Sequence, residues 1–349
     1  ENCHGWLGIK FQSRPSDEDN QIILHVRMLD DSNQLQQEAL GIVGVNLVYG
    51  ALNLFHDPDE LLKSLLDNLS NKRIEIDMIE FSGIEFRHID NRLMSLKLVQ
   101  LGYSNAAMFS PEGKVIQPAE TLYKKDIIIE RGSFRPVTHV NLDMLKCAEK
   151  ALNNDGKLHN ETIILTEITM KNLLATGEID YNDFLARVDT LAACGQTVLI
   201  SNYFEYYRLS AYLRLVTSGK INLVMGISNL IELFNEKYYT HLEGGILESL
   251  GRLFKHNTAL YIYPSINESN GEQNTIHNLQ LPGEIQELYN YLISKGSIRQ
   301  LSTDNPEYLK IFSRKILEQI KNKDNSWESG VPEKVASLIK EQKLFSYSD

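Results

Sequence analysis

The chain has 349 residues, of which 42% are hydrophobic and 23% charged, and its formal net charge is −11. This length predicts two domains, or one large domain with an appendage, in a globular protein. A membrane-spanning helix needs roughly 18 consecutive apolar residues, and the sequence has no such run. The acidic balance disfavours nucleic acid as a partner, because binding its phosphates needs clustered Lys and Arg. We therefore expect a small-molecule partner, no nucleic acid and no membrane, while assembly into a homo-oligomer stays open.

The three cysteines, Cys3, Cys147 and Cys194, are too few and too scattered for a disulfide framework. They predict free thiols in a reducing, cytoplasmic setting. No Cys/His spacing is typical of structural zinc, so we expect no metal ligands among them. The chain begins at Glu1 rather than Met, so we expect a piece upstream, and a removed targeting segment stays open.

Residues 1–121 are predicted to form an N-terminal α/β unit of unknown role. Apolar runs and alternations predict its strands, and apolar faces that follow helix-start signals such as Asp57-Pro58 predict its helices. Residues 111–121 are expected to be a connector. The expected strands are 22–28, 73–81 and 106–109, and the expected helices are 34–54, 57–69 and 91–101.

From residue 122 to residue 349, strands and helices alternate regularly. Strands separated by helices of ~10–15 residues form βαβ units with right-handed crossovers, so we expect an α/β fold with a Rossmann-like, mostly parallel sheet. Ligands of such sheets bind at the carboxyl ends of the strands. The expected strands are 126–130, 162–165, 196–201, 221–226 and 258–263. The expected helices are 142–152, 180–193, 204–216, 229–239 and 248–254, with more helices after a polar loop over 265–282.

The stretch from Gly132 to Asn141 lies between the first of these strands and its helix. Backbone N–H groups at a helix start are unpaired and the helix dipole favours an anion there, so this geometry predicts a phosphate site. Gly132 allows the backbone to approach the phosphate, Pro136 stiffens the turn, and Thr138 and Asn141 supply side-chain donors. The alternative is an ordinary turn in which Thr138 or Asn141 caps the helix.

This stretch resembles the signature of the nicotinamide/nicotinate mononucleotide adenylyltransferases. In that family a strand ends in Gly-x-Phe-x-Pro, followed by His or Thr, two further residues and His. Asn141 stands where the last His is expected, and a His lies two residues earlier, at His139. The matching residues are Gly132, Phe134, Pro136 and Thr138.

The end of the chain resembles the same family. Residues 330–340 are similar to its closing helix of the type Val-Pro-x-x-Val-x-x-Tyr-Ile. The family places an Ile-Ser-Ser-Thr-x-x-Arg helix start before that helix. Ile311 and Ser313 match this start, but Arg314 replaces Thr, and Leu317 replaces the phosphate-binding Arg.

Two weaker similarities lie between these motifs. Residues 223–230 resemble a strand ending in Gly-x-Asp-Leu, with Gly226 at the Gly and the amide of Asn229 near the Asp. Arg187 is placed like the Arg that opens an Arg-x-x-Met helix. The resemblance covers residues 122–349 and none of residues 1–121.

The resemblance implies a nucleotidyltransferase-like domain over 122–349 that acts in NAD biosynthesis. It would transfer an adenylyl group from ATP, with Mg²⁺ as cofactor, to a nicotinamide/nicotinate mononucleotide-like acceptor, by positioning and charge stabilisation. The implied catalytic residues are Thr138, His139 and Asn141, with no protein ligand to a metal. The implied nucleotide-binding residues are Gly132, Ser133, Phe134, Arg135, Pro136, Gly226, Asn229, Ser313 and Arg314.

The departures from the pattern leave two alternatives open. The loss of an Arg at Leu317 removes roughly 2–4 kcal/mol of transition-state stabilisation, which Arg135, His139 or Arg314 could offset. Without that offset the domain would be a catalytically degenerate nucleotide-binding sensor or scaffold. The other alternative is an enzyme of another class, with its site between the two α/β units and built from Glu75, Asp77 or His25.

The segment from Asn202 to Arg208 is rich in aromatic residues and follows a predicted strand. A base or a nicotinamide ring could stack there. The alternative is that these rings pack at a sheet edge or at a subunit contact.

Overall fold

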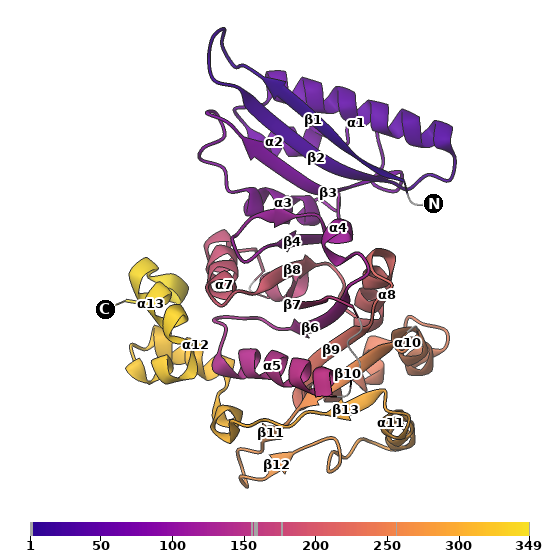
Figure 1. The fold of residues 1–349 in the computed structure, drawn as a ribbon, viewed down its shortest axis with the longest axis vertical. Helices are drawn as coiled ribbons and strands as arrows, with labels where there is room; N and C mark the ends of the chain where they lie inside the picture. Colours follow the sequence, from indigo (N-terminus) through magenta and orange to yellow (C-terminus); the bar gives the residue numbers. More distant parts are fainter. Residues whose placement is uncertain (1–2, 155, 157–159, 176, 256, 349) are drawn as a thin grey trace. The chain divides into compact units, whose positions relative to one another are not determined.

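The computed structural model describes all residues except 1–2, 155, 157–159, 176, 256 and 349 (Figure 1). The chain forms two compact units. The first comprises residues 1–118 with 199–202, and the second comprises 119–198 with 203–349. No helix in the described part of the chain is both long and apolar enough to cross a bilayer.

The first unit contains an antiparallel sheet of three strands in the order β1-β2-β3. Its inward-facing side chains, among them Leu24, Val26 and Ile76, pack with the buried face of the long helix α1 in one apolar core. Ser32 begins α1 by accepting a hydrogen bond from the backbone N–H of Leu35. The elements are β1 (His4–Phe11), β2 (Asn20–Met28), α1 (Asn33–Asn53), α2 (Pro58–Ser64), β3 (Ile74–Ser82), α3 (Asn91–Gln100), β4 (Ala106–Phe109) and β5 (Val115–Ile116).

The larger sheet has eight strands in the order β13-β10-β9-β6-β7-β8-β4-β5. Strand β6 pairs in parallel with β7 and β9, and β10 pairs in parallel with β9 and β13, while β4 and β5 are antiparallel. The predicted α/β fold with a mostly parallel sheet is therefore confirmed. The remaining strands are β6 (Asp126–Arg131), β7 (Thr162–Thr169), β8 (Thr197–Ser201), β9 (Ile221–Gly226), β10 (Thr258–Tyr263) and β13 (Ile298–Gln300), with a small hairpin of β11 (Ser265–Ile266) and β12 (Gln273–Asn274).

Helices connect the strands of the second unit. Helix α5 packs on β6, β9 and β10 through an apolar cluster that includes Met144, Val224 and Tyr261. The helices are α4 (Pro118–Leu122), α5 (His139–Asn154), α6 (Met170–Leu173), α7 (Tyr181–Ala193), α8 (Tyr206–Val216), α9 (Ile227–Leu233), α10 (Gly245–Leu253), α11 (Ile285–Ser294), α12 (Ser313–Lys321) and α13 (Glu333–Gln342), with 3₁₀ turns at 236–238, 306–310, 325–330 and 344–346.

Several boundaries differ from the sequence prediction. Strand β7 extends four residues beyond 165, because Thr166 and Glu167 continue the parallel ladder opposite Glu130 and Arg131. Helix α5 begins three residues earlier than expected, because the side chain of Asn141 closes its first turn. The connector 111–121 contains β5 and the start of α4, and the region after 282, where only helices were expected, contains β13.

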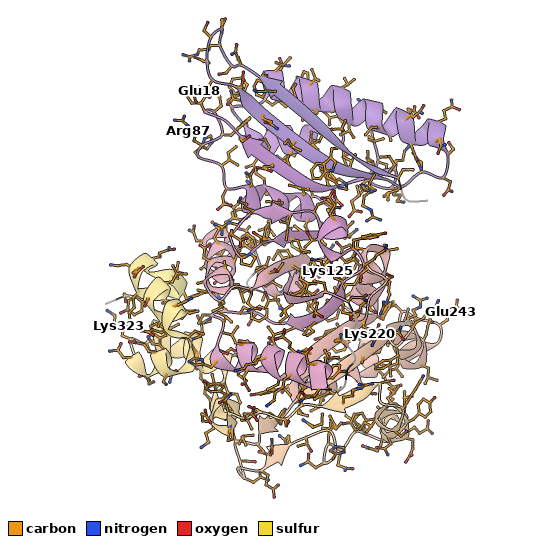
Figure 2. All side chains as sticks on the ribbon, viewed as in Figure 1. Glu18, Arg87, Lys125, Lys220, Glu243 and Lys323 are labelled. Atoms are coloured by element: carbon orange, nitrogen blue, oxygen red, sulfur yellow. The ribbon has the colours of Figure 1, made fainter. Side chains whose placement is uncertain are left out.

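Lysines at the start of the central strands lie at the opposite end of the sheet from the carboxyl ends of the strands, where a ligand is expected. Lys125 and Lys220 directly precede β6 and β9 (Figure 2), so they lie at the amino ends of these parallel strands. Lys125 forms an ion pair with Glu161 at 2.8 Å. These cations therefore do not face a ligand bound at the carboxyl ends.

Candidate functional site

A cavity of about 460 Å³ lies at the carboxyl ends of β6, β9 and β10. Its walls come from residues 130–134, 226–229 and 263–265, which end or follow these strands, and from the first turns of α5 and α12. This is the edge at which α/β sheets bind ligands. The predicted site residues in its lining are Gly132, Ser133, Phe134, Asn141, Gly226, Asn229, Ser313 and Arg314. A ligand role for any of them stays a prediction.

The Gly132 turn is tightly packed. A Cβ atom at residue 132 would lie 2.9–3.1 Å from three ring carbons of Phe134, closer than side chains normally approach. Phe134 is buried, and its φ of 45° lies in the left-handed region, which is unusual for a residue other than glycine. The backbone carbonyl of Gly132 accepts a hydrogen bond from Asn172 at 3.2 Å. The turn is thus a rigid wall of the cavity.

Asn141 organises the start of α5. Its Oδ1 accepts hydrogen bonds from the backbone N–H of Thr138 at 3.0 Å and from the Thr138 hydroxyl at 2.8 Å. This is the reciprocal half of a capping box, in which a side chain in the first turn reaches back to the residue before the helix. Its Nδ2 donates to Oε1 of Glu130 at 2.6 Å. Thr138 is fully buried and is not part of the cavity lining.

Glu130 is the functional candidate that the sequence prediction missed. It ends an apolar run, lines the cavity and is 1% exposed. Its Oε2 has no hydrogen-bond partner among the described residues. Burial raises the pKa of Glu130 to about 8, and the hydrogen bond from Asn141 opposes this rise. A carboxylic acid directly after the apolar run Ile127-Ile128-Ile129, two residues before the glycine of the turn, was the available signal.

The arginines near the turn are paired with carboxylates. Arg131 forms a bidentate pair with the buried Glu167 at 2.8 and 2.9 Å, the strong geometry for this interaction. Arg135, predicted to bind nucleotide, contacts Asp183 and is not in the cavity lining, and its ligand role stays a prediction. Arg187 contacts the same Asp183 and donates to the backbone carbonyl of Ser133 at 3.2 Å. These pairs hold the turn in place.

Arg314 offers a cation to the cavity. It lies in the first turn of α12, is exposed, and has no carboxylate partner among the residues that the structure describes. Phe312 precedes the helix and gives no side-chain cap. The first backbone N–H groups of α12 therefore have no side-chain acceptor from that position, and the helix dipole adds partial positive charge beside Arg314.

His139 is placed outside the cavity lining. Its ring stacks on Tyr308, with centroids 5.0 Å apart and planes within 7°. Burial lowers the pKa of His139, and a hydrogen bond to the backbone of Val331 opposes this effect. His139 thus connects the turn to the segment that precedes α13. Pro136, the remaining predicted residue, is also absent from the lining.

The end of β10 is tied to α5 through Asp143. This buried carboxylate accepts hydrogen bonds from Tyr263 at 2.5 Å, Thr303 at 2.6 Å and Asn305 at 2.7 Å. Burial alone would raise the pKa of Asp143, but these donors lower it below its ordinary value. The network fixes Tyr263, which lines the cavity.

A second, smaller cavity of about 190 Å³ shares Arg131, Tyr206 and Asn229 with the first. Phe204 lies in its lining, with the ammonium of Lys171 3.6 Å from the centre of the ring. The aromatic segment predicted to stack on a ligand ring therefore borders the main cavity. Stacking itself stays a prediction.

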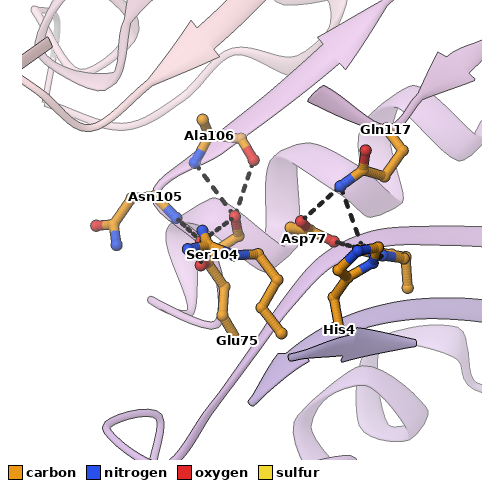
Figure 3. A network of polar contacts seen from close by, with 9 residues as sticks. His4, Glu75, Asp77, Ser104, Asn105, Ala106 and Gln117 are labelled. Atoms are coloured by element: carbon orange, nitrogen blue, oxygen red, sulfur yellow. Dashed lines mark hydrogen bonds and ion pairs between the residues drawn. The ribbon is translucent and has the colours of Figure 1, made fainter. Parts of the chain in front are cut away.

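Glu75, Asp77 and His25, the three residues of the alternative site, make polar contacts within the first unit, and Figure 3 shows Glu75 and Asp77 with their partners. His25 contacts Asp77 at 2.5 Å and the ring of His4 at 2.9 Å. Glu75 pairs with Arg27 at 2.9 Å; burial raises its pKa, and Arg27 opposes this rise. Each of the three thus has a polar partner within the first unit.

The chain is similar to several solved structures of other proteins. No protein-family model and no curated protein matches the chain. The chain is similar to a candidate nicotinate-nucleotide adenylyltransferase from Vibrio parahaemolyticus, with a TM-score of 0.32 and 13% identity over 64% of this chain and 97% of that one. It is also similar to a glucose-6-phosphate dehydrogenase in complex with glucose-6-phosphate, with a TM-score of 0.26 and 10% identity over 58% of this chain and 40% of that one.

Proposed function

We propose that residues 122–349 bind a nucleotide in the cavity at the ends of β6, β9 and β10. The observation that carries this proposal is that the Gly132 turn and the start of α12 line the same cavity. The start of α12 brings an exposed Arg314 and backbone N–H groups without a side-chain cap. Such a helix start attracts phosphate groups.

We further propose transfer of an adenylyl group from ATP to a nicotinamide/nicotinate mononucleotide-like acceptor. An oxygen of the acceptor's phosphate would attack the α-phosphorus of ATP as the bond to pyrophosphate breaks, so no covalent enzyme intermediate is needed. The cavity would position the phosphates, and Arg314 would stabilise the charge that develops on pyrophosphate. The adjoining aromatic cavity around Phe204 and Tyr206 would receive the acceptor's ring.

Mg²⁺ belongs to this proposal as part of the ATP complex, bound by phosphate oxygens as is usual for this ion. Among the described residues, no group of three or more His, Cys, Asp or Glu side chains is placed to hold a metal ion.

A second candidate function is nucleotide binding without turnover, in a sensor or scaffold. The pairing of Arg131, Arg135 and Arg187 with carboxylates favours it. Cations held in this way offer less charge to a transition state than Arg314, which has no carboxylate partner among the described residues. The cavity would then recognise the ligand's phosphates without driving the chemistry.

Calorimetry with ATP, together with a pyrophosphate-release assay, separates these functions. The full chain is mixed with Mg²⁺, ATP and nicotinamide or nicotinate mononucleotide. Pyrophosphate that requires both nucleotides supports the transferase. ATP binding without pyrophosphate supports the sensor, and the absence of ATP binding contradicts both.

Arg314→Ala tests the role of the cavity itself. Losing one charge-assisted hydrogen bond of about 1.5–3 kcal/mol predicts ATP binding weakened roughly ten- to hundredfold. Lys321→Ala is the matched control, because it removes the same charge from the last turn of the same helix, about 10 Å away along its axis. Equal effects of the two variants would assign the loss to overall charge rather than to the cavity.

A further inference from the structure

Glu130 lines the cavity; one of its carboxyl oxygens is hydrogen-bonded, and the other has no partner in the part of the chain that the structure describes. Oε1 accepts from Asn141 at 2.6 Å, and Oε2 is buried with no hydrogen-bond partner among the described residues. An unpaired polar atom in a buried place is costly, and native structures pair the great majority of such atoms. Glu130 is one of the residues that line the cavity, so a ligand bound there is the candidate for the missing partner.

The hydrogen bonds around Asn141 determine where a proton on Glu130 must lie. Oδ1 of Asn141 already accepts from both the backbone and the hydroxyl of Thr138. The amide therefore cannot turn over without losing two bonds, and its Nδ2 must donate to Glu130. Because Oε1 serves as an acceptor, a proton on this carboxyl lies on Oε2 and points to the partner still missing.

Among the residues that the structure describes, Glu130 has no ion-pair partner. Arg131, next in β6, is held by Glu167. The strand neighbours opposite Glu130 are Thr166 in β7 and Val224 in β9, neither of which is charged. The phenol of Tyr206, from α8, is nearby but buried, with its pKa raised to about 12 by burial. Arg314, from α12, lines the same cavity and is exposed.

We propose that protonated Glu130 is a specificity-determining residue that donates a hydrogen bond from Oε2 to a non-bridging phosphate oxygen of the bound nucleotide. This inference rests on the proposed function. It assigns the site to ligands with an anionic phosphate group at the strand end, and it makes binding depend on the proton. Burial favours the neutral acid at pH 7, and a carboxylate formed at higher pH would repel the phosphate.

The test measures the affinity of two probes, ATP and inorganic tripolyphosphate, by calorimetry without Mg²⁺. Above pH 7 the terminal phosphate of ATP is already ionised, since its pKa is about 6, so the pH profile is measured with ATP, and tripolyphosphate tests phosphate binding at pH 7. With a group that titrates near pH 8, wild-type affinity should fall about tenfold by pH 9 and about thirtyfold by pH 9.5. The wild-type curve needs no variant, so it is not affected by misfolding.

Glu130→Gln keeps the size of the side chain and removes its ability to titrate, so it separates the effect of the proton from the effect of shape. Its carbonyl can accept from Asn141 while its N–H group donates toward the phosphate, without a charge. We expect affinity within about threefold of wild type at pH 7, from loss of at most a fraction of one hydrogen bond, and no fall up to pH 9.5. Glu318→Gln, at an exposed position on α12, is the charge-matched control and should keep the wild-type fall.

Five results overturn the inference. A flat wild-type curve, or an equal fall in Glu130→Gln, does so while nucleotide binding stands. A loss above tenfold in Glu130→Gln at pH 7 would make Glu130 an acceptor for a ligand hydroxyl or amine instead. Affinity that rises above pH 8 only with added Mg²⁺ would make it a metal ligand. If neither probe binds wild type at pH 7, the proposed function fails and the inference with it.

Discussion

Gly132→Ala tests whether the tight turn under the cavity is built as the structure indicates. The new methyl group would lie 2.9–3.1 Å from three ring carbons of Phe134. The ring is 2% exposed, so it cannot move into solvent without opening the turn. Overpacking of this kind costs about 1–3 kcal/mol. We expect that loss in the free energy of unfolding, together with weaker ATP binding.

Gly251→Ala provides a control of opposite sign. Gly251 lies inside helix α10, and a Cβ atom there would meet nothing within 4 Å. Alanine in a helix interior is more stable than glycine by roughly 0.5–1 kcal/mol. The same chemical change should therefore stabilise the protein at 251 and destabilise it at 132.

The assay follows the second unit alone. The chain has two tryptophans, Trp6 in the first unit and the fully buried Trp327 in the second. In a Trp6→Phe background, the fluorescence of Trp327 during urea denaturation reports the unfolding of the second unit. If Gly132→Ala unfolds at the same urea concentration as its parent and binds ATP unchanged, the argument from the packed turn is wrong.

Further predictions concern the side chains around the cavities. Asn141→Leu should lower the free energy of unfolding by about 2–4 kcal/mol in the same assay, because it leaves buried polar groups without partners. Phe204→Ala should weaken mononucleotide binding roughly five- to 150-fold and leave ATP binding unchanged by calorimetry, since stacking is worth about 1–3 kcal/mol. Burial raises the pKa of Cys147 and Cys194 to about 11, so both should react slowly with iodoacetamide at pH 7.5, as measured by mass spectrometry. Because burial raises the pKa of Glu130 to about 8, the folded chain keeps a proton that the unfolded chain releases near pH 4. The free energy of unfolding should therefore fall from pH 5 to pH 8, and Glu130→Gln should flatten that slope.

The central strands of the larger sheet could be predicted because they are buried on both faces. Strands β6, β9 and β10 appear as short apolar runs between polar segments, the pattern of a parallel sheet covered by helices. Strand β1 was not predicted, since Gly5 and Gly8 interrupt its alternation and weaken the strand signal. Strand β13 has three residues and forms only along the edge of β10, so no local pattern reveals it.

The backbone of the candidate site was predictable, but the partners of its side chains were not. A glycine turn before a helix has a sequence pattern, and Gly132 and Asn141 were found in this way, whereas Ser313 was found from the family resemblance at the end of the chain. The pairing of Arg135 with Asp183 joins residues 48 positions apart. Such a contact depends on how α7 packs beside the turn, which periodicity does not encode. For this reason the sequence offered Arg135 as a phosphate ligand, whereas in the structure it pairs with a carboxylate.

Two neighbouring ionisable residues of β6, Glu130 and Arg131, differ in how far their partners compensate the cost of burying them. Arg131 and Glu167 form a buried pair between adjacent strands, so each compensates the other's loss of water. Within the described ranges, Glu130 has one amide partner and one oxygen without a hydrogen bond, although an apolar residue would suit its place in the core. Folding alone gives no reason to keep this acid, because its burial opposes stability at neutral pH. A ligand that completes the hydrogen bonding of Glu130 would give a reason for an acid at this position, and the cavity is where such a ligand would bind.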